Sequence, residues 1–476
     1  MTNQNIGIFI FRKDLRLHDN LALIELSKKC DKIIPIYIFD NYQIDITDHN
    51  KYYRSNNAVQ FLCESLIDLN KQLDNNLTCF KGDTLSILEQ IIKTFFKHEN
   101  NIIIGFNKDY TKYAIKRDTL ILNLLQKYKI ESVNVDHDHT LIPFENMIKS
   151  NNMGYVVYGA FYKNAIKTKV NNPIKNIFKK YFKYSLLDFN RISINEFNKL
   201  YKENKYIAQH GGRTIALKKI NNNSVYKDYS KNRDYLDFNT YQVSAALNFG
   251  CVSIREFYHI IKSNIDIKKQ LYWRDFYNCI LRYIPNANSY SLMIDPRFNK
   301  VKWPNSPKYW NKLMESKTGF LIIDAAMREL IKTGYIGNRV RLILGTFWIK
   351  YLLINPLHAK YGSQVGFSQF LVDCNASQNK LNHQWFTDLD LSGRRFAKKG
   401  CNSLTGRMMR IDNDVIKKFD PDCNYIKQWL PELKDIPNKD LYKWNTEIQK
   451  KYNIHCAPIF DWEERYSEYC KLFKNI

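Results

Sequence analysis

The chain has 476 residues, of which 45% are hydrophobic and 14% aromatic; it is long enough for two domains or more, and this composition excludes global disorder. The formal net charge of +25, from 72 Lys and Arg against 47 Asp and Glu, favours a polyanionic partner such as nucleic acid, although a solvated lysine surface explains the same number. The ten cysteines show no CxxC or Cys/His ligand spacing, so no metal site is indicated.

The first third of the chain alternates strand-like and helical patterns. Helical patterns include 57–73, 84–96 and 112–127, and they lie between short apolar runs. Strands separated by helices favour a five-stranded parallel sheet, so residues 1–145 are predicted to form a Rossmann-like α/β domain. The first strand is not followed by GxGxxG, so the usual dinucleotide fingerprint is missing there. The predicted strands are Ile6–Phe11, Ile33–Phe39, Leu77–Phe80, Ile102–Phe106 and Ser132–Val135.

Residues 146–205 are predicted to form an interdomain linker on the surface, because the regular pattern loosens there. The linker is rich in lysine, asparagine and tyrosine. Residues 206–476 show helical periods and no convincing strand, and we expect an all-α domain. The linker lysines are Lys163, Lys167, Lys169, Lys175, Lys179, Lys180 and Lys183.

Three segments of the predicted helical domain carry polar residues in apolar surroundings. Thr240 and Ser244 open a helical pattern, which suits either a phosphate at free N–H groups or an ordinary N-cap. The stretch 317–351 places Asn338, Arg339 and Arg341 among apolar residues. Buried arginines need an internal carboxylate partner or a bound anion. The segment 370–385 supplies Asp373, Asn375 and Asn379 at spacings suited to one polar pocket.

These segments resemble the photolyase/cryptochrome family. The resemblance extends to FRKDLRLHDN (11–20), QLYWRDFYNCILRYIPN (270–286) and IKQWLPELKDIP (426–437), and so covers nearly the whole chain. It is strongest to class I photolyases, which act on cyclobutane pyrimidine dimers. It implies an α/β antenna-type domain, a long linker and a helical domain that holds FAD.

The resemblance also implies which residues hold the cofactor. Arg341 and Asp373 would form a pair beside the isoalloxazine ring, and Asn379 would face flavin N5. A neutral amide at that position is typical of repair enzymes in the family. Gln242 stands where the family usually has Arg, which removes one positive charge near the phosphates. The cofactor-binding residues implied in this way are Tyr229, Thr240, Tyr241, Val243, Ser244, Gln270, Arg274, Arg341, Asp373, Asn375 and Asn379.

On the substrate side, Trp273 and Trp385 match two tryptophans that stack against a flipped pyrimidine dimer. Gln270 and Asn338 would form hydrogen bonds with the bases. Repair of the other major lesion, the (6-4) photoproduct, needs two histidines four residues apart, where this chain has Asn338 and Leu342. The residues expected to contact DNA are Arg274 and Arg339, together with Arg394, Arg395, Lys398, Lys399, Arg407 and Arg410 in and beside an extended basic loop.

Two other family features are altered. Of the three tryptophans that commonly relay electrons to the flavin, only the outermost has a counterpart, Trp303, while Pro356 and His383 occupy the other two positions. The glutamate that grips a folate antenna is replaced by Thr111. The 107–118 segment looks closer to deazaflavin binders, so the identity of an antenna pigment, deazaflavin or folate, stays open.

Together these features predict a blue-light-driven, FAD-dependent enzyme that splits cyclobutane pyrimidine dimers in DNA. The alternative is a cryptochrome-like light sensor, favoured by the broken tryptophan series and by Gln270. No apolar run approaches the roughly 20 residues of a membrane span, and no signal peptide is recognised. We therefore expect an intracellular monomer, cytoplasmic or nuclear, without a membrane partner.

Overall fold

The structure is a computed structural model that describes residues 4–47, 54–96, 101–222, 229–238, 240–261, 264–289, 291–387, 389, 411 and 413–473. The chain divides into two compact units. The first unit consists of Met1–Asn204, Gln209–Asn223 and Gln242–Tyr283, and the second of Lys205–Ala208, Ser224–Tyr241 and Ile284–Ile476. The domain boundaries expected at residues 145 and 205 stay a prediction.

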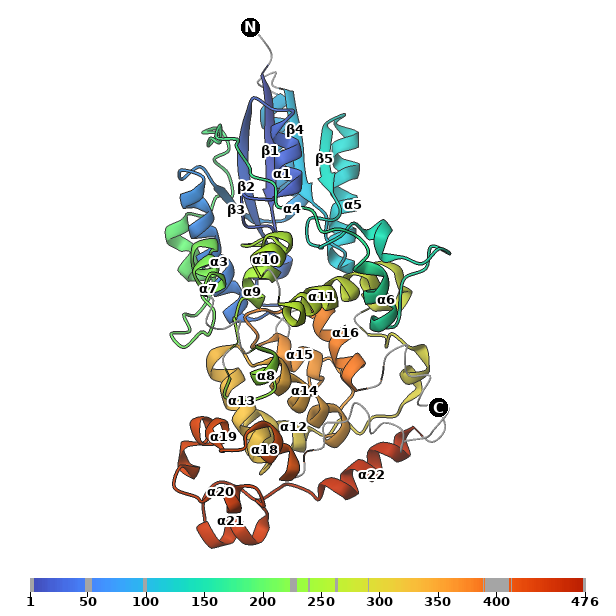
Figure 1. The fold of residues 1–476 in the computed structure, drawn as a ribbon. Helices are drawn as coiled ribbons and strands as arrows, with labels where there is room; N and C mark the ends of the chain where they lie inside the picture. The colour runs from blue at the N-terminus through green and yellow to red at the C-terminus, as the bar shows by residue number, and fades with distance from the viewer. Residues whose placement is uncertain are drawn as a thin grey trace. The chain divides into compact units, whose positions relative to one another are not determined.

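The first unit is built on a five-stranded parallel sheet in the order β3-β2-β1-β4-β5, which confirms the predicted α/β fold (Figure 1). The central strands are almost continuously apolar because helices cover both faces of the sheet. Ile8, Ile34 and Ile104 are completely buried in the resulting core. The strands are β1 (Asn5–Phe11), β2 (Lys32–Asp40), β3 (Thr78–Gly82), β4 (Asn101–Asn107) and β5 (Glu131–Val135).

The helices of the sheet region begin where the sequence offers capping side chains. Ser55 accepts a hydrogen bond from the backbone of Ala58, and Thr111 accepts one from Ala114. α4 turns one apolar stripe inward, including Ile87, at the spacing of a helix buried on one side. These helices are α1 (Leu21–Ser27), α2 (Asn41–Ile44), α3 (Asn56–Gln72), α4 (Thr84–Phe96) and α5 (Lys112–Lys127).

The rest of the first unit is helical. α6 (Tyr158–Ala165) packs against α11 (Ile265–Tyr283), the long helix that carries the WRDF motif. α10 (Ile254–Ile260) precedes α11, and the backbone N–H of Leu141, beyond β5, donates to Asp275 of α11. α11 therefore lies at the carboxyl edge of the sheet, where ligand sites of α/β proteins form. The remaining helices are η1 (Phe144–Met147), η2 (Ile194–Leu200), α7 (Arg213–Ile220) and α9 (Ser244–Asn248).

The second unit has no strand in its described residues, as the helical periods predict. Its core includes an apolar cluster that contains Leu344, Trp348 and Tyr425, and a second, smaller cluster around Trp303. Gly334 adopts a left-handed conformation (φ 69°) at the end of α13. No helix in the described part of the chain is both long enough and apolar enough to cross a bilayer. The longer helices are α12 (Pro307–Met314), α13 (Leu321–Thr333), α14 (Asn338–Thr346), α16 (Ala376–Phe386) and α22 (Trp462–Leu472).

The remaining elements of this unit are short. A π-helical turn, η6, continues α14 directly, and α8 lies far upstream of it in the sequence. These elements are α8 (Tyr229–Asn232), η4 (Pro285–Asn288), η5 (Pro296–Lys300), η6 (Phe347–Tyr351), α15 (Ser363–Ser368), α18 (Asn413–Phe419), α19 (Asn424–Trp429), η8 (Pro431–Leu433), α20 (Asn438–Leu441) and α21 (Thr446–Tyr452).

One buried ion cluster makes the stability of the second unit depend on pH. His455 Nε2 lies 2.9 Å from Asp324 Oδ2, and its Nδ1 lies 3.3 Å from Glu432 Oε1. Burial lowers the pKa of His455, but the hydrogen bonds and charge interactions with Asp324 and Cys456 together outweigh it and raise the pKa to about 10. The charged imidazolium thus stabilises the fold fully below the ordinary value near 6.5, and this contribution is lost as the pH rises through 10.

We expect His455→Gln to lower the free energy of unfolding by about 2–4 kcal/mol at pH 6 and by much less at pH 10.5. Urea denaturation of both proteins at the two pH values measures the difference, and it isolates His455 from the other titrating groups. Equal losses at both pH values would contradict the assignment.

Candidate functional site

The second unit contains the predicted arginine–aspartate pair. Arg341 lies in the first turn of α14, and its Nη2 donates to both carboxylate oxygens of Asp373, at 2.8 and 3.1 Å. Its Nε donates to the carbonyl oxygen of Ile336 at 3.0 Å, and the guanidinium lies 5.3 Å from the ring centre of Tyr335. Both partners are largely buried, with side-chain exposures of 16% and 6%. The hydrogen bonds hold this charged pair in place beside the apolar core of the unit.

Asn379 lies in the first turn of α16 and is the most informative residue of this unit. Its side chain is buried, and its amide nitrogen has no hydrogen-bond partner in the described residues. A buried amide donor without an acceptor costs free energy of the order of 1–3 kcal/mol. Rotation of the amide exchanges its oxygen and nitrogen, so the side chain can offer either atom to a ligand. Asn379 is therefore suited to contact a bound ligand.

Two other predicted cofactor residues have structural partners. The Asn375 side chain accepts a hydrogen bond from Gln378 N at 3.1 Å and caps α16. The Thr240 hydroxyl lies 3.3 Å from the Tyr335 hydroxyl, and Tyr335 is the ring under Arg341. Thr240 is thereby joined to the charged pair through one tyrosine, although the two segments are about a hundred residues apart in the sequence. Tyr229 begins α8, and Tyr241 is buried.

Ser244, in the first unit, starts α9 and is held by a residue that the sequence did not single out. Buried Gln209 donates from Nε2 to the Ser244 hydroxyl at 3.1 Å, and its Oε1 accepts from Ala245 N at 3.0 Å. Val243 is the residue before the helix, and Gln242 has a left-handed backbone (φ 48°). Gln209 therefore fixes the conformation of the predicted phosphate segment.

The position expected for the innermost relay tryptophan holds a neutral histidine. His383 Nδ1 lies 3.0 Å from the Ser363 hydroxyl, and burial lowers the pKa of His383 to about 3. Its ring packs edge-on against Phe367 and Phe386. Trp303 is buried in a separate apolar cluster with Tyr469 and Phe473, and Pro356 is buried as well. The expected effect of this incomplete tryptophan series on electron transfer to the flavin stays a prediction.

In the first unit, Trp273 is stacked face to face on Tyr158. The two ring centres are 3.6 Å apart and the planes differ by 5°. The Tyr158 hydroxyl donates to the carbonyl oxygen of Lys269, one turn earlier on α11, at 2.9 Å. Tyr158 therefore fixes the plane of the indole. Tyr158 lies in the segment predicted to be a surface linker, so the sequence did not reveal this contact.

Gln270 and Arg274 lie on the same helix as Trp273. Gln270 makes only a long contact, 3.5 Å from Nε2 to the carbonyl oxygen of Asp266, which leaves its amide able to turn toward a ligand. Arg274 donates to the carbonyl oxygens of His139 and Leu247. Leu247 belongs to α9, so Arg274 joins α11 to the helix that begins at Ser244.

Asn338, Arg339 and Trp385 belong to the second unit. Asn338 is exposed at the start of α14, and Trp385 is half-buried in the last turn of α16. Arg339 pairs with Asp234, and its guanidinium lies 4.8 Å from the ring centre of Phe419. A contact between Arg339 and DNA would have to compete with that carboxylate. The basic loop residues Arg394, Arg395, Lys398, Lys399, Arg407 and Arg410 lie outside the described residues.

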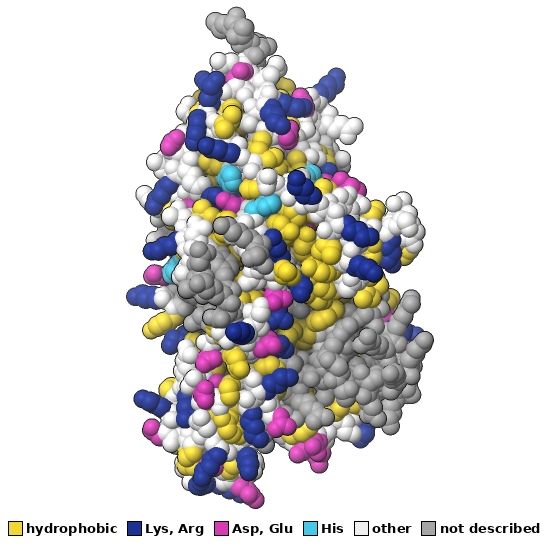
Figure 2. Space-filling model, in the orientation of Figure 1, with side chains coloured by type: hydrophobic (Ala, Val, Ile, Leu, Met, Phe, Trp, Pro, Cys, Tyr) yellow, Lys and Arg dark blue, Asp and Glu magenta, His cyan; other side chains and the backbone are white. Residues whose placement is uncertain are grey.

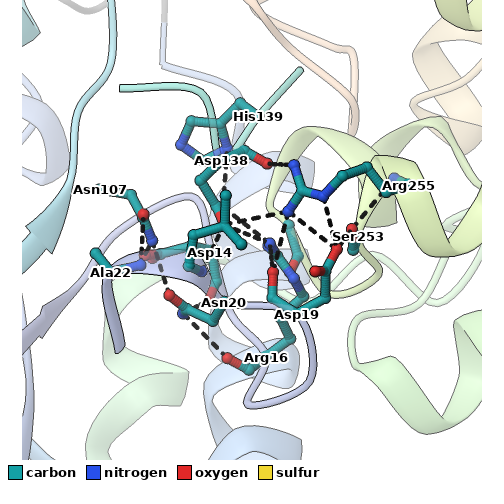
Figure 3. A network of polar contacts seen from close by, with 12 residues as sticks. Asp14, Arg16, Asp19, Asn20, Ala22, Asn107, Asp138, His139, Ser253 and Arg255 are labelled. Atoms are coloured by element: carbon teal, nitrogen blue, oxygen red, sulfur yellow. Dashed lines mark hydrogen bonds and ion pairs between the residues drawn. The ribbon is translucent and has the colours of Figure 1, made fainter. Parts of the chain in front are cut away.

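A buried network of charges, supplied in part by the N-terminal FRKDLRLHDN motif, occupies the carboxyl edge of the sheet (Figure 3). Arg16 Nη2 donates to both carboxylate oxygens of Asp138, at 2.8 and 2.9 Å. Arg255 of α10 donates from Nε to Asp19 Oδ2 at 2.9 Å and from Nη1 to three carbonyl oxygens of residues 137–140. Asp14 accepts from Asn107 at the end of β4. The network ties α10, and through it α11, to the ends of three strands.

The predicted antenna region lies beside this network. Arg12 pairs with Asp118 at 2.8 Å, and Thr111 serves as the N-cap of α5. One buried guanidinium nitrogen of Arg12 and the buried hydroxyl of Tyr110 have no hydrogen-bond partner among the described residues. These polar atoms suit a ligand at the edge of the sheet, and they leave the choice between a deazaflavin and a folate open.

Comparison with known proteins identifies the class to which this fold and site belong. Residues 267–475 match the family model described as "FAD binding domain of DNA photolyase", and residues 8–176 match "DNA photolyase". A deoxyribodipyrimidine photo-lyase of Buchnera aphidicola is 30% identical, with 98% of this chain and 96% of that protein covered. Cryptochrome-2 of Gallus gallus is 25% identical, with 92% and 77% covered. The chain therefore belongs to the photolyase/cryptochrome family, and its helical part is an FAD-binding domain of that family.

A solved structure agrees with this assignment. An archaeal photolyase from Sulfolobus tokodaii, whose structure is described as containing two FAD molecules with the implication of a novel light-harvesting cofactor, has a TM-score of 0.84 and 28% identity. The alignment covers 99% of this chain and 100% of that one. The fold of both units is thus the photolyase fold.

The residues present fit a flavin. A buried guanidinium–carboxylate pair, an unpartnered buried amide and a hydroxyl pair lie on neighbouring segments of the second unit. An isoalloxazine ring offers both donors and acceptors at its polar edge, which match an amide and a charged pair. FAD therefore fits the donor set that the second unit supplies.

Proposed function

We propose that this protein is a light-driven flavoenzyme that splits cyclobutane pyrimidine dimers in DNA. The observation that carries the proposal is the buried Asn379 amide nitrogen, which has no partner among the described residues and lies on the helix that follows the Arg341–Asp373 pair. FAD, when bound in its reduced form, would supply the light-driven electron donation that opens the dimer ring and would take the electron back. Arg341 and Asp373 would hold the polar edge of the flavin.

The protein itself would orient the flavin and the pyrimidine dimer and would exclude water from them. Asn379 adds no charge at its position, which suits a reduced flavin that carries a negative charge. Trp273, held in plane by Tyr158, offers a flat surface for an extruded pyrimidine. We propose contacts to the bases for Gln270 in the first unit and for Trp385 and Asn338 in the second, and contacts to the DNA backbone for Arg274 and Arg339.

The proposal favours the cyclobutane dimer over the (6-4) photoproduct. α14 offers Asn338 and Leu342 at the two positions where the (6-4) chemistry needs a proton-transferring histidine. His383, on α16, is neutral and hydrogen-bonded to Ser363. The second candidate function is a light sensor, and the observation that favours it is His383 and Pro356 in place of relay tryptophans.

Illumination of the chemically reduced protein separates these functions. With an oligonucleotide that contains a cyclobutane dimer, we expect the absorbance of thymine to return under blue light. With a (6-4) lesion we expect no return. Repair of the (6-4) lesion alone would overturn the substrate assignment, and repair of neither lesion would favour the sensor.

The stacked Tyr158 gives a more local prediction. Tyr158→Ala removes the support of the indole, and we expect the affinity for dimer-containing DNA to fall about three- to tenfold, in line with the 0.5–1.5 kcal/mol of an aromatic pair. Tyr158→Phe keeps the ring and loses only the bond to Lys269, so it should stay within about twofold of the wild type. Fluorescence anisotropy with damaged and undamaged duplexes measures both. An equal loss for the two duplexes would show that Tyr158 does not act through the lesion pocket.

A further inference from the structure

The segment from Met147 to Leu187 contains eight lysines and no aspartate or glutamate. Seven of these lysines have exposed side chains. None of the eight forms an ion pair with a carboxylate in the described part of the structure. Positive charges that lie close together without carboxylate partners repel one another, and they attract polyanions. The lysines are Lys149, Lys163, Lys167, Lys169, Lys175, Lys179, Lys180 and Lys183.

The backbone separates six of these lysines into two groups of three. The carbonyl oxygen of Lys180 accepts from Ile33 N, and Phe182 N donates to the carbonyl oxygen of Ile33. Ile33 is the second residue of β2, so the group Lys179, Lys180 and Lys183 lies at the amino edge of the sheet. The carboxyl end of β2 is seven residues further on, which corresponds to roughly 23 Å of extended chain.

The group Lys163, Lys167 and Lys169 lies on and just after α6, beside α11. Along this contact Tyr158 stacks on Trp273, Phe161 packs on Phe276, and Tyr162 packs edge-on against Tyr272. α6 and α11 accordingly run side by side in the first unit (Figure 1). The aromatic side of α6 is used in this contact, and the three lysines remain exposed.

We propose that Lys163, Lys167 and Lys169 form a track for the phosphodiester backbone of duplex DNA that flanks the lesion. The inference rests on the proposed function and extends its DNA contact from α11 to the linker helix. Lysines that contact phosphates release counterions and give affinity without sequence preference. Such contacts would set the register of the duplex while Trp273 receives the extruded pyrimidine.

An anionic membrane surface is the competing partner for exposed lysines that alternate with apolar residues. Val157 and Ile166 are each 49% exposed. However, Phe161 and Ala165 of α6 are buried, so the helix has no free apolar face to insert into a bilayer. The packing therefore favours nucleic acid.

The number of positive charges alone does not show where DNA binds. Lys and Arg side chains are spread over the whole face that Figure 2 shows, with acidic side chains among them. A variant of equal charge change at another place is needed for comparison. Lys179, Lys180 and Lys183 supply it, because they are exposed and belong to the same acid-free segment.

The test compares the triple variants K163A/K167A/K169A and K179A/K180A/K183A in the full-length protein. Binding to a dimer-containing duplex is measured from 50 to 200 mM salt. We expect the slope of log K against log salt to become shallower by about 2 to 3 in the first variant, since each phosphate contact contributes about 0.9. The slope of the second variant should stay within about 0.5 of the wild type.

Equal slope changes in the two variants, or an unchanged slope in the first, would overturn the inference. Loss of binding to vesicles of anionic phospholipid in the first variant, with the DNA slope unchanged, would replace it with a membrane contact. An isolated dimer dinucleotide has no flanking duplex for the lysines to contact, but the wild-type protein should still split it. That reaction reports on the proposed function separately from the lysine track.

Discussion

Asp373→Ala should yield a protein that purifies without flavin. In the wild type both oxygens of Asp373 accept from Arg341 in a largely buried site. Removal of one partner of a buried pair leaves an uncompensated charge and costs about 3–5 kcal/mol. A loss of 3 kcal/mol in FAD binding corresponds to a roughly 100-fold weaker affinity. The flavin released per chain on heating, and titration of the apoprotein with FAD, measure the effect.

Two comparisons keep this prediction specific. Asp414 pairs with Lys417 on the surface, with a side-chain exposure of 82%, and Asp414→Ala should retain the wild-type flavin content. Asn379→Ala removes an amide nitrogen that has no partner in the described protein, and alanine suits a helix. It should therefore fold normally, bind FAD about tenfold more weakly, and shift the reduction potential of the bound flavin. Full flavin content in both Asp373→Ala and Asn379→Ala would exclude this site.

Arg255→Gln is the second large change. Arg255 reaches Asp19 and three backbone carbonyl oxygens beyond β5, and it joins residues 236 positions apart in the chain (Figure 3). The substitution leaves the carboxylate of Asp19 buried with a weaker partner. We expect the free energy of unfolding of the first unit to fall by about 3–5 kcal/mol.

Hydrogen exchange of the amides of β1 and α10 measures this loss where it arises. Lys28→Gln is the matched control, because Lys28 pairs with Glu25 on an exposed face, with exposures of 62% and 48%. That change should alter protection by less than about 0.5 kcal/mol. A loss below about 1 kcal/mol in Arg255→Gln would show that the network does not hold α10 and α11 to the sheet.

The five strands of the first unit, and the three helices for which the sequence predicts bounds, agree with the structure to within one or two residues. The second strand was expected at 33–39 and is Lys32–Asp40, and the helices expected at 84–96 and 112–127 have these bounds in the structure. The reason is physical, because a parallel sheet covered on both faces requires continuous apolar runs, and its helices require one apolar stripe.

The candidate site was only partly predictable. Arg341 and Asp373 stand out because charged residues in an apolar segment need partners, and the structure pairs them. Tyr158 and Gln209 were missed. Tyr158 meets Trp273 across more than a hundred residues, and Gln209 meets Ser244 across 35. Contacts of this kind leave no periodic signal in the local sequence. The roles of the site residues toward flavin and DNA stay predictions.

The most direct test of the central claim is to strip the protein of FAD, reload it, reduce it, and illuminate it with a dimer-containing oligonucleotide. The account predicts that the absorbance of thymine returns only when both FAD and blue light are present. It also predicts that Asp373→Ala, at FAD concentrations that saturate the wild type, shows little return. Return of thymine absorbance in the dark or without FAD, or no return from the fully loaded and reduced wild type, would contradict it.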